Sequence, residues 1–97
     1  MNRRVVTLVI WRDGSQVCKP VPVYWPSDID LPTAHNRDVL ALDDGQGSML
    51  FDVDRRVFCP QRGSGKSHVI LTVISQNKAL DRRRILKGVE NTFGPQV

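Results

Sequence analysis

Cysteine is scarce in this chain, since the 97 residues contain only Cys18 and Cys59. The two cysteines stand far apart, with no Cys-X-X-Cys pair and no spacing typical of a metal site. Small secreted domains usually carry more cysteines, because disulfides replace the core that a short chain cannot build. We therefore expect a cytoplasmic protein. A disulfide between Cys18 and Cys59 stays open as an alternative, because sequence separation does not fix the distance between two Cα atoms.

Long apolar runs are also missing. The run from Val69 to Ile74 is interrupted by Thr72 and is far shorter than the roughly 20 residues of a membrane helix. The segment from Met1 to Trp11 has the charge order of a signal peptide, but no small-residue cleavage site follows it. We expect a soluble chain with no membrane partner.

The chain is too short for several large enzyme folds. A dinucleotide-binding fold with a substrate domain, a complete P-loop NTPase and a TIM barrel each need far more residues. With 40% hydrophobic and 25% charged residues, the composition is that of an ordinary globular protein. We expect one domain over residues 1–97.

Charge is distributed unevenly along the sequence. The formal net charge is +4, but residues 28–54 carry seven Asp against one Arg, whereas residues 55–97 carry nine basic against two acidic residues. Arginine outnumbers lysine by ten to four, which favours bidentate contacts to phosphate. This asymmetry is typical of chains that bind nucleic acid, although acidic and basic segments of one domain also pair with each other.

Two β-hairpins are expected from the pattern of turns and β-branched residues. The strand 4–11 leads into Asp13-Gly14, a pair that favours a type I′ turn. The returning arm, 16–25, contains Pro20 and Pro22 and is therefore an edge strand.

The second hairpin is predicted from two apolar runs, 39–42 and 49–53, separated by a turn cluster. In its second arm Met49, Phe51 and Val53 alternate with polar or exposed positions, so one side of this arm is expected to be buried. The later run 69–74 is apolar at both sets of alternate positions. It predicts a central strand covered on both sides.

The last segment has helical periodicity, with its apolar residues on about one third of a helical wheel. These residues are Ala79, Ile85, Leu86, Val89 and Phe93. Asn77 is the expected N-cap, and Gly94-Pro95 is the expected stop. The predicted fold class is therefore α+β, mainly β: about five mostly antiparallel strands in a curled sheet or small barrel, with one C-terminal amphipathic helix.

One loop resembles a phosphate-binding motif only in part. Residues 63–67 end in the Gly-Lys-Ser of a Walker A sequence, but Pro60 stands where the leading glycine belongs, and a strand is predicted where that motif needs a helix. Nucleotide hydrolysis is therefore not expected. Arg62 and Lys66 make this loop a candidate for nonspecific contact with a nucleic-acid backbone.

No arrangement of titratable residues predicts catalysis. Four aspartates are metal-ligand candidates only if the second hairpin gathers them, and alternating aspartates are usually the solvated side of a strand. These are Asp43, Asp44, Asp52 and Asp54. His35 and His68 are isolated in sequence. We expect no enzyme activity, no catalytic residue, no metal and no cofactor.

The leading hypothesis is a small protein that binds nucleic-acid phosphates through its basic C-terminal half. The candidate residues are Arg55, Arg56, Arg62, Lys66, Arg83, Arg84 and Lys87. Tyr24 and Trp25 are candidates for base stacking or for a protein interface, and because adjacent strand residues face opposite ways, one of the two is expected to be exposed.

The alternative hypothesis is a protein-interaction or assembly module, such as a homodimer or an inhibitor-like accessory protein. It rests on the acidic segment 28–54 and on an unpaired strand edge, either of which could dock a protein partner.

Overall fold

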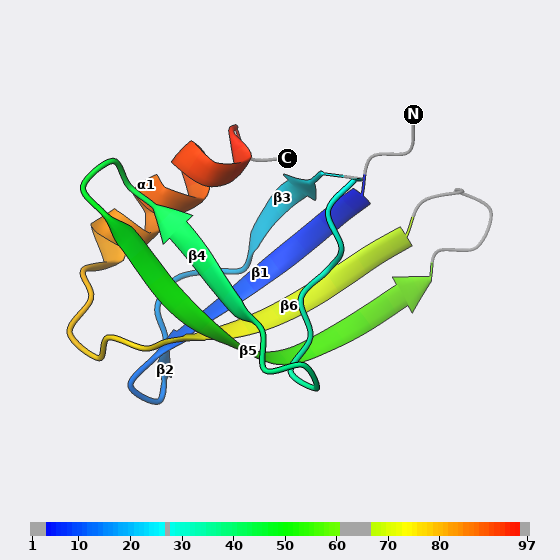
Figure 1. Ribbon diagram of the computed structural model, residues 1–97, viewed down its shortest axis with the longest axis horizontal. Helices are drawn as coiled ribbons and strands as arrows, with labels where there is room; N and C mark the ends of the chain where they lie inside the picture. The colour runs from blue at the N-terminus through cyan, green and yellow to red at the C-terminus, as the bar shows by residue number, and fades with distance from the viewer. Residues whose placement is uncertain (1–3, 27, 61–66, 96–97) are drawn as a thin grey trace.

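The computed structural model describes residues 4–26, 28–60 and 67–95, and it contains six strands and one helix (Figure 1). In chain order the elements are β1 (Arg4–Arg12), β2 (Ser15–Gln16), β3 (Val21–Trp25), β4 (Val39–Asp43), β5 (Ser48–Pro60), β6 (Ser67–Ser75) and α1 (Arg82–Phe93). The strands form one curled sheet that does not close into a barrel. The α+β, mainly-β prediction is confirmed.

The sheet is mixed rather than fully antiparallel. Its strand order is β2-β1-β6-β5-β4, and β3 pairs with the same edge of β1 as β2 does. β1 and β6 run parallel, whereas the other pairs of described strands are antiparallel. The first and the last strands of the chain therefore lie side by side in the centre of the sheet.

The first hairpin forms at the predicted turn. Asp13 (φ 49°) and Gly14 (φ 79°) both have positive φ, as a type I′ turn requires. The returning arm is split into the two-residue β2 and the later β3, which pairs with β1 at the sheet edge. Pro20 and Pro22 cannot donate a backbone hydrogen bond, which accounts for the edge position.

The second hairpin joins β4 to the first part of β5. Met49, Phe51 and Val53 are buried, as their alternation predicts. The register shifts between Val53 and Arg55, so Asp54 is the extra residue of a β-bulge. A bulge bends a strand, and Figure 1 shows β5 changing direction along its length before it continues beside β6.

The N-cap of the helix lies four residues later than predicted. Asp81, not Asn77, is the N-cap, and its carboxylate accepts a hydrogen bond from Arg83 N at 2.7 Å. Asn77 instead closes a local turn, because its side-chain oxygen accepts from Ala79 N at 3.0 Å. The helix ends at Gly94 (φ 79°), as predicted.

Gly88 lets the helix pack closely on the second hairpin. An added Cβ at this position would lie 3.2 Å from Leu42 Cβ and would overlap Met49 Cε. Glycine costs a helix about 1 kcal/mol relative to alanine. The structure offsets that cost with buried contacts between Gly88 and the paired residues Leu42 and Met49.

One prediction for β6 is wrong. The strand is central, but the described elements cover it on one side only: Val69, Leu71 and Val73 are buried, whereas Ile74 is exposed. The reason is that α1 and the segment 26–38, which supplies the buried Leu31, pack on the same face of the sheet. Figure 1 shows this segment crossing β1 and β6.

Candidate functional site

The candidate site is the side of the sheet that faces away from α1. Cross-strand register places the alternate residues of four strands there, and within the described ranges no element packs over them. We call this surface the open face. It consists of Pro22 and Tyr24 from β3; Val5, Thr7, Val9 and Trp11 from β1; His68, Ile70, Thr72 and Ile74 from β6; and Arg55, Val57 and Cys59 from β5.

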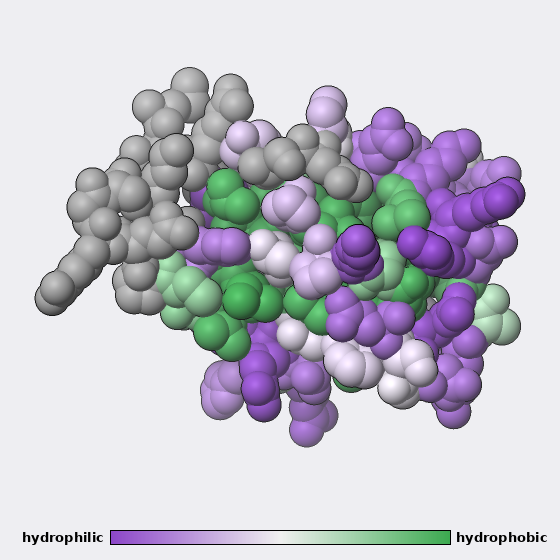
Figure 2. All heavy atoms as spheres, turned by 180° about the vertical axis from the view of Figure 1, so that it is seen from behind, coloured by the Kyte–Doolittle hydropathy of each residue, from purple (hydrophilic) through white to green (hydrophobic). Residues whose placement is uncertain are grey.

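The open face is mainly apolar. Val57 is 40% exposed and Ile74 38%, and the central residues from β1 and β6 are half-buried by their neighbours. Figure 2 shows hydrophobic residues gathered across the middle of the molecule when it is seen from behind, with hydrophilic residues around them. Single exposed apolar residues are ordinary, but a contiguous apolar patch on a protein surface marks an interaction site.

Few polar groups interrupt this surface. Thr7 Oγ1 and His68 Nε2 lie 2.5 Å apart across β1 and β6, so they satisfy each other. Cys59 is paired in register with His68, and its thiol is free. Arg55 brings a positive charge to this side of the sheet, and Asp52, which is in register with Ile74, brings a negative one. The chemistry available here is therefore apolar contact with one cation and one carboxylate.

The second thiol lies on the other side of the sheet. Cys18 packs against the hydrophobic core and is also free. Burial raises the pKa of the Cys18 thiol, and the nearby charge of Arg82 partly opposes this shift. The alternative of a Cys18–Cys59 disulfide is thus not what the structure contains.

The predicted basic residues of the helix divide into two kinds. Arg83 and Lys87 are exposed. Arg84 instead donates from Nε to Oδ2 of the buried Asp44 at 2.7 Å. This hydrogen bond, followed by one from Gln46 N, lowers the pKa of the Asp44 carboxyl. The same contact raises the pKa of Arg84. The ion pair between Arg84 and Asp44 therefore holds the β4–β5 turn against α1.

The predicted basic residues of β5 face opposite sides of the sheet. Arg55 lies on the open face, whereas Arg56 donates to Leu31 O at 3.4 Å and lies 5.0 Å from the centre of the Phe58 ring. The half of β5 that holds both residues runs away from α1 (Figure 1). Arg62 and Lys66 lie outside the described residues. The structure therefore does not gather the five described candidates into one basic surface.

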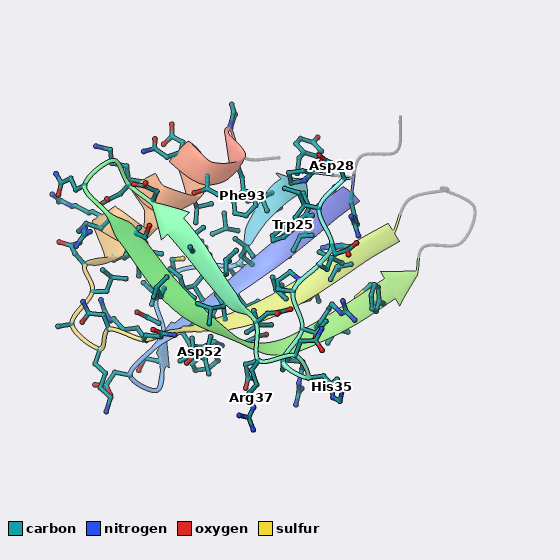
Figure 3. The ribbon with its side chains drawn as sticks, in the orientation of Figure 1. Trp25, Asp28, His35, Arg37, Asp52 and Phe93 are labelled. Atoms are coloured by element: carbon teal, nitrogen blue, oxygen red, sulfur yellow. The ribbon has the colours of Figure 1, made fainter. Side chains whose placement is uncertain are left out.

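Tyr24 and Trp25 face opposite ways, as expected. Tyr24 is 38% exposed on the open face, whereas Trp25 is buried. The Trp25 ring lies 5.2 Å from that of Phe93, and the two point toward one another in Figure 3. Trp25 Nε1 also donates to Ile29 O at 3.0 Å. Trp25 thus fastens the helix end to β3, and Tyr24 is the member of the pair that a partner can reach.

Three of the four candidate metal ligands have separate contacts, and the fourth, Asp54, is the exposed extra residue of the β-bulge. Asp44 binds Arg84, Asp43 accepts from Gly45 N at 2.7 Å, and Asp52 accepts from Gln76 Nε2 at 2.8 Å. Across residues 4–26, 28–60 and 67–95, no three acidic, histidine or cysteine side chains are grouped as metal ligands. Asp43, Asp44 and Asp52 therefore make separate local contacts and do not form a gathered site.

Comparison with known proteins gives no relative: no family model matches the chain, and neither a curated protein nor a solved structure shows significant similarity. The one helix among the described residues is too short and too polar to cross a membrane.

The apolar character of the open face was missed in the sequence. Val5, Val9 and Ile70 alternate with buried residues of the same kind, and such runs predict strands buried on both sides. The number of predicted helices could have indicated the uncovered face. One predicted helix covers one face of a sheet, so a strand that is apolar on both faces leaves one apolar face uncovered.

Proposed function

We propose that this protein is a protein-binding module whose contact surface is the open face. The observation that carries the proposal is the one-sided covering of the sheet: α1 and the segment 26–38 bury one face, and the opposite apolar face has no covering element in the described part of the chain. Apolar burial is the main favourable term in protein association, worth about 25 cal/mol per Å².

The composition of the open face favours a protein over a nucleic acid. Binding of single strands needs aromatic platforms in a basic groove. The two central strands supply mainly valine, isoleucine and threonine here, and Arg55 is the single fixed cation. Flat β-branched surfaces instead match the apolar centre of a protein interface, from which charged residues are depleted.

The test compares two variants with equally simple substitutions. Val57→Glu places a charge on the open face, and Ile29→Glu places one at an exposed apolar residue away from it. Immobilised wild-type protein and the two variants are incubated with an extract of the native cells, and bound chains are identified by mass spectrometry. A polypeptide retained by wild type and by Ile29→Glu but lost from Val57→Glu supports the proposal. Equal retention by all three contradicts it.

Nucleic-acid binding through α1 is the second candidate function. The first turn of α1 contains Arg82, Arg83 and Arg84 and no acidic residue. Cations at a helix N-terminus oppose the helix dipole by roughly 0.3–1 kcal/mol each, a cost that an anionic ligand would offset. Two of the three side chains, Arg82 and Arg83, are exposed.

A salt titration tests the second candidate. Fluorescence anisotropy of labelled single- and double-stranded oligonucleotides is followed against salt for wild type and for Arg83→Ala/Lys87→Ala. If these residues contact phosphates, the double variant binds more weakly and its slope of log K against log salt falls by roughly two. An unchanged slope, or no binding by wild type at low salt, contradicts this function.

A further inference from the structure

We infer that the occupant of the open face is a second copy of this chain, and that two sheets pack face to face in a symmetric dimer. The inference rests on the proposed function, because it names the partner for the same surface. Its first support is architectural. A β-sheet with two apolar faces is stable when each is covered, and the described elements that could cover a face, α1 and the segment 26–38, both lie on the other side.

The size of the open face suits a weak dimer. One side chain on a sheet face occupies about 32 Å², given by the strand spacing and twice the rise per residue, so the open face measures about 400 Å² in projection. Accessible area exceeds projected area, and stable interfaces bury at least about 600 Å² per partner. The surface is near this lower limit, where weak and transient interfaces lie, so we expect a weak dimer and look for it at micromolar protein concentrations.

The distribution of charge permits two basic chains to meet here. Each copy has a formal net charge of +4, but the fixed charges that β5 brings to this side of the sheet, Arg55 and Asp52, have opposite signs. Asp52 and Asp54, both exposed, precede Arg55 on β5 and supply the opposite sign at the border. The exposed cations of α1 belong to the element that packs on the other face of the sheet. Repulsion between them is reduced, because charges separated by more than about 8–10 Å are screened at physiological salt.

The open face of a second chain also has a shape that is complementary to this surface. An interface with two-fold symmetry must be complementary to itself. Two stacked sheets align at about 30°, and this angle arises from the twist that each sheet carries. Copies of one sheet have the same twist, so a surface of valine, isoleucine and threonine meets an equivalent surface across the axis.

Sedimentation equilibrium over a range of protein concentrations tests the inference. Wild type is expected to pass from monomer to dimer in the micromolar range. Val57→Glu and Ile74→Lys each place a charge in the proposed interface and should weaken the dimer by about tenfold or more. Ile29→Lys, at an exposed residue outside the open face, should associate as wild type does. Circular dichroism establishes that each variant is folded.

A labelling experiment on the unchanged protein gives independent evidence. Cys59 lies on the open face and Cys18 on the helix side of the sheet, so both are probes within the same molecule. As protein concentration rises through the dimerisation range, alkylation of Cys59 should slow by the fraction of chain that dimerises, while alkylation of Cys18 stays constant.

A wild-type protein that stays monomeric, with constant Cys59 labelling, overturns the inference. So does a dimer that Val57→Glu and Ile74→Lys leave intact, because its interface then lies elsewhere. Either result leaves the proposed function to be decided separately, since a different polypeptide would still be lost from Val57→Glu in the binding experiment.

Discussion

The Nε atom of Arg84 donates a hydrogen bond to Oδ2 of Asp44 at 2.7 Å and thereby joins α1 to the turn between β4 and β5. The two residues come from oppositely charged parts of the sequence: Asp44 lies in the acidic segment 28–54, and Arg84 lies in the basic segment 55–97. At this point the acidic and the basic segments pair with each other. The charge asymmetry that suggested a nucleic-acid partner is therefore used in part for folding.

The pair predicts how stability depends on pH. Because the pKa of Asp44 is lowered in the folded protein, the ionised carboxylate stabilises the fold above the unfolded pKa of about 4, and this stabilisation is lost as pH falls through the folded pKa. Asp44→Asn should melt below wild type at pH 7, and the difference should shrink as the pH falls below about 4. Thermal melts from pH 2 to 7 measure it.

The matched control for this prediction is Asp28→Asn, at an exposed aspartate in the segment 26–38. Its melting temperature should follow that of wild type, because surface substitutions usually change stability by less than about 0.5 kcal/mol. A constant difference between Asp44→Asn and wild type at every pH would show that ionisation of Asp44 does not stabilise the fold.

Gly88→Ala should destabilise the protein although alanine is the better helix former. The added methyl group meets Leu42 and Met49, and such overpacking costs about 1–3 kcal/mol, against a gain of about 1 kcal/mol in helix propensity. Urea denaturation measures the free energy of unfolding. Lys87→Ala, at the exposed neighbouring position, is the control and should be nearly neutral. A Gly88→Ala protein that is more stable than wild type by the full propensity gain of about 1 kcal/mol would mean that α1 and the second hairpin are not in close contact.

Arg83→Glu should stabilise the helix while removing a candidate phosphate contact. A carboxylate in the first turn favours the helix dipole, and a Glu at this position stands four residues before Lys87, so a gain of about 0.5–1 kcal/mol is expected. Urea denaturation is again the measurement. Lys87→Glu, in the middle of the helix, changes the net charge equally without the dipole effect. An equal change in both variants would argue against the dipole.

The reactivity of Cys18 should respond to Arg82. The Arg82 charge opposes the rise in the Cys18 pKa that burial causes, so Arg82→Ala should raise this pKa further. The thiolate is the reactive form, and alkylation of Cys18 at pH 8 should therefore slow in Arg82→Ala. Arg83→Ala serves as the control for a general loss of helix charge. Unchanged Cys18 kinetics in Arg82→Ala would contradict the contact.

Local chemistry made much of the fold predictable. The Asp13-Gly14 pair specifies its turn through positive φ, and Gly94 specifies the helix end in the same way. The N-cap was harder, because Asn77 and Asp81 are both good capping residues, and the turn that Asn77 closes depends on the chain beyond it. The parallel pairing of β1 with β6 joins residues far apart in the sequence, such as Val5 and His68, and has no local signal.

The candidate site was less predictable for a physical reason. A valine or isoleucine on a strand has the same sequence pattern whether its face is packed in the core or meets another chain, because both are apolar environments. Val57 and Ile70 therefore gave no separate signal. Arginine residues drew attention instead, yet Arg84 is tied to Asp44 and Arg56 to Leu31 O.

Site-specific photo-crosslinking is the most direct test of the claim that the open face meets another polypeptide. A photoreactive amino acid replaces Val57 on the open face or Ile29 away from it, and the protein is irradiated in its native cells. The account predicts a discrete protein adduct from position 57 and none from position 29, with twice the mass of this chain if the partner is a second copy. No adduct from position 57, or the same adducts from both positions, would contradict it.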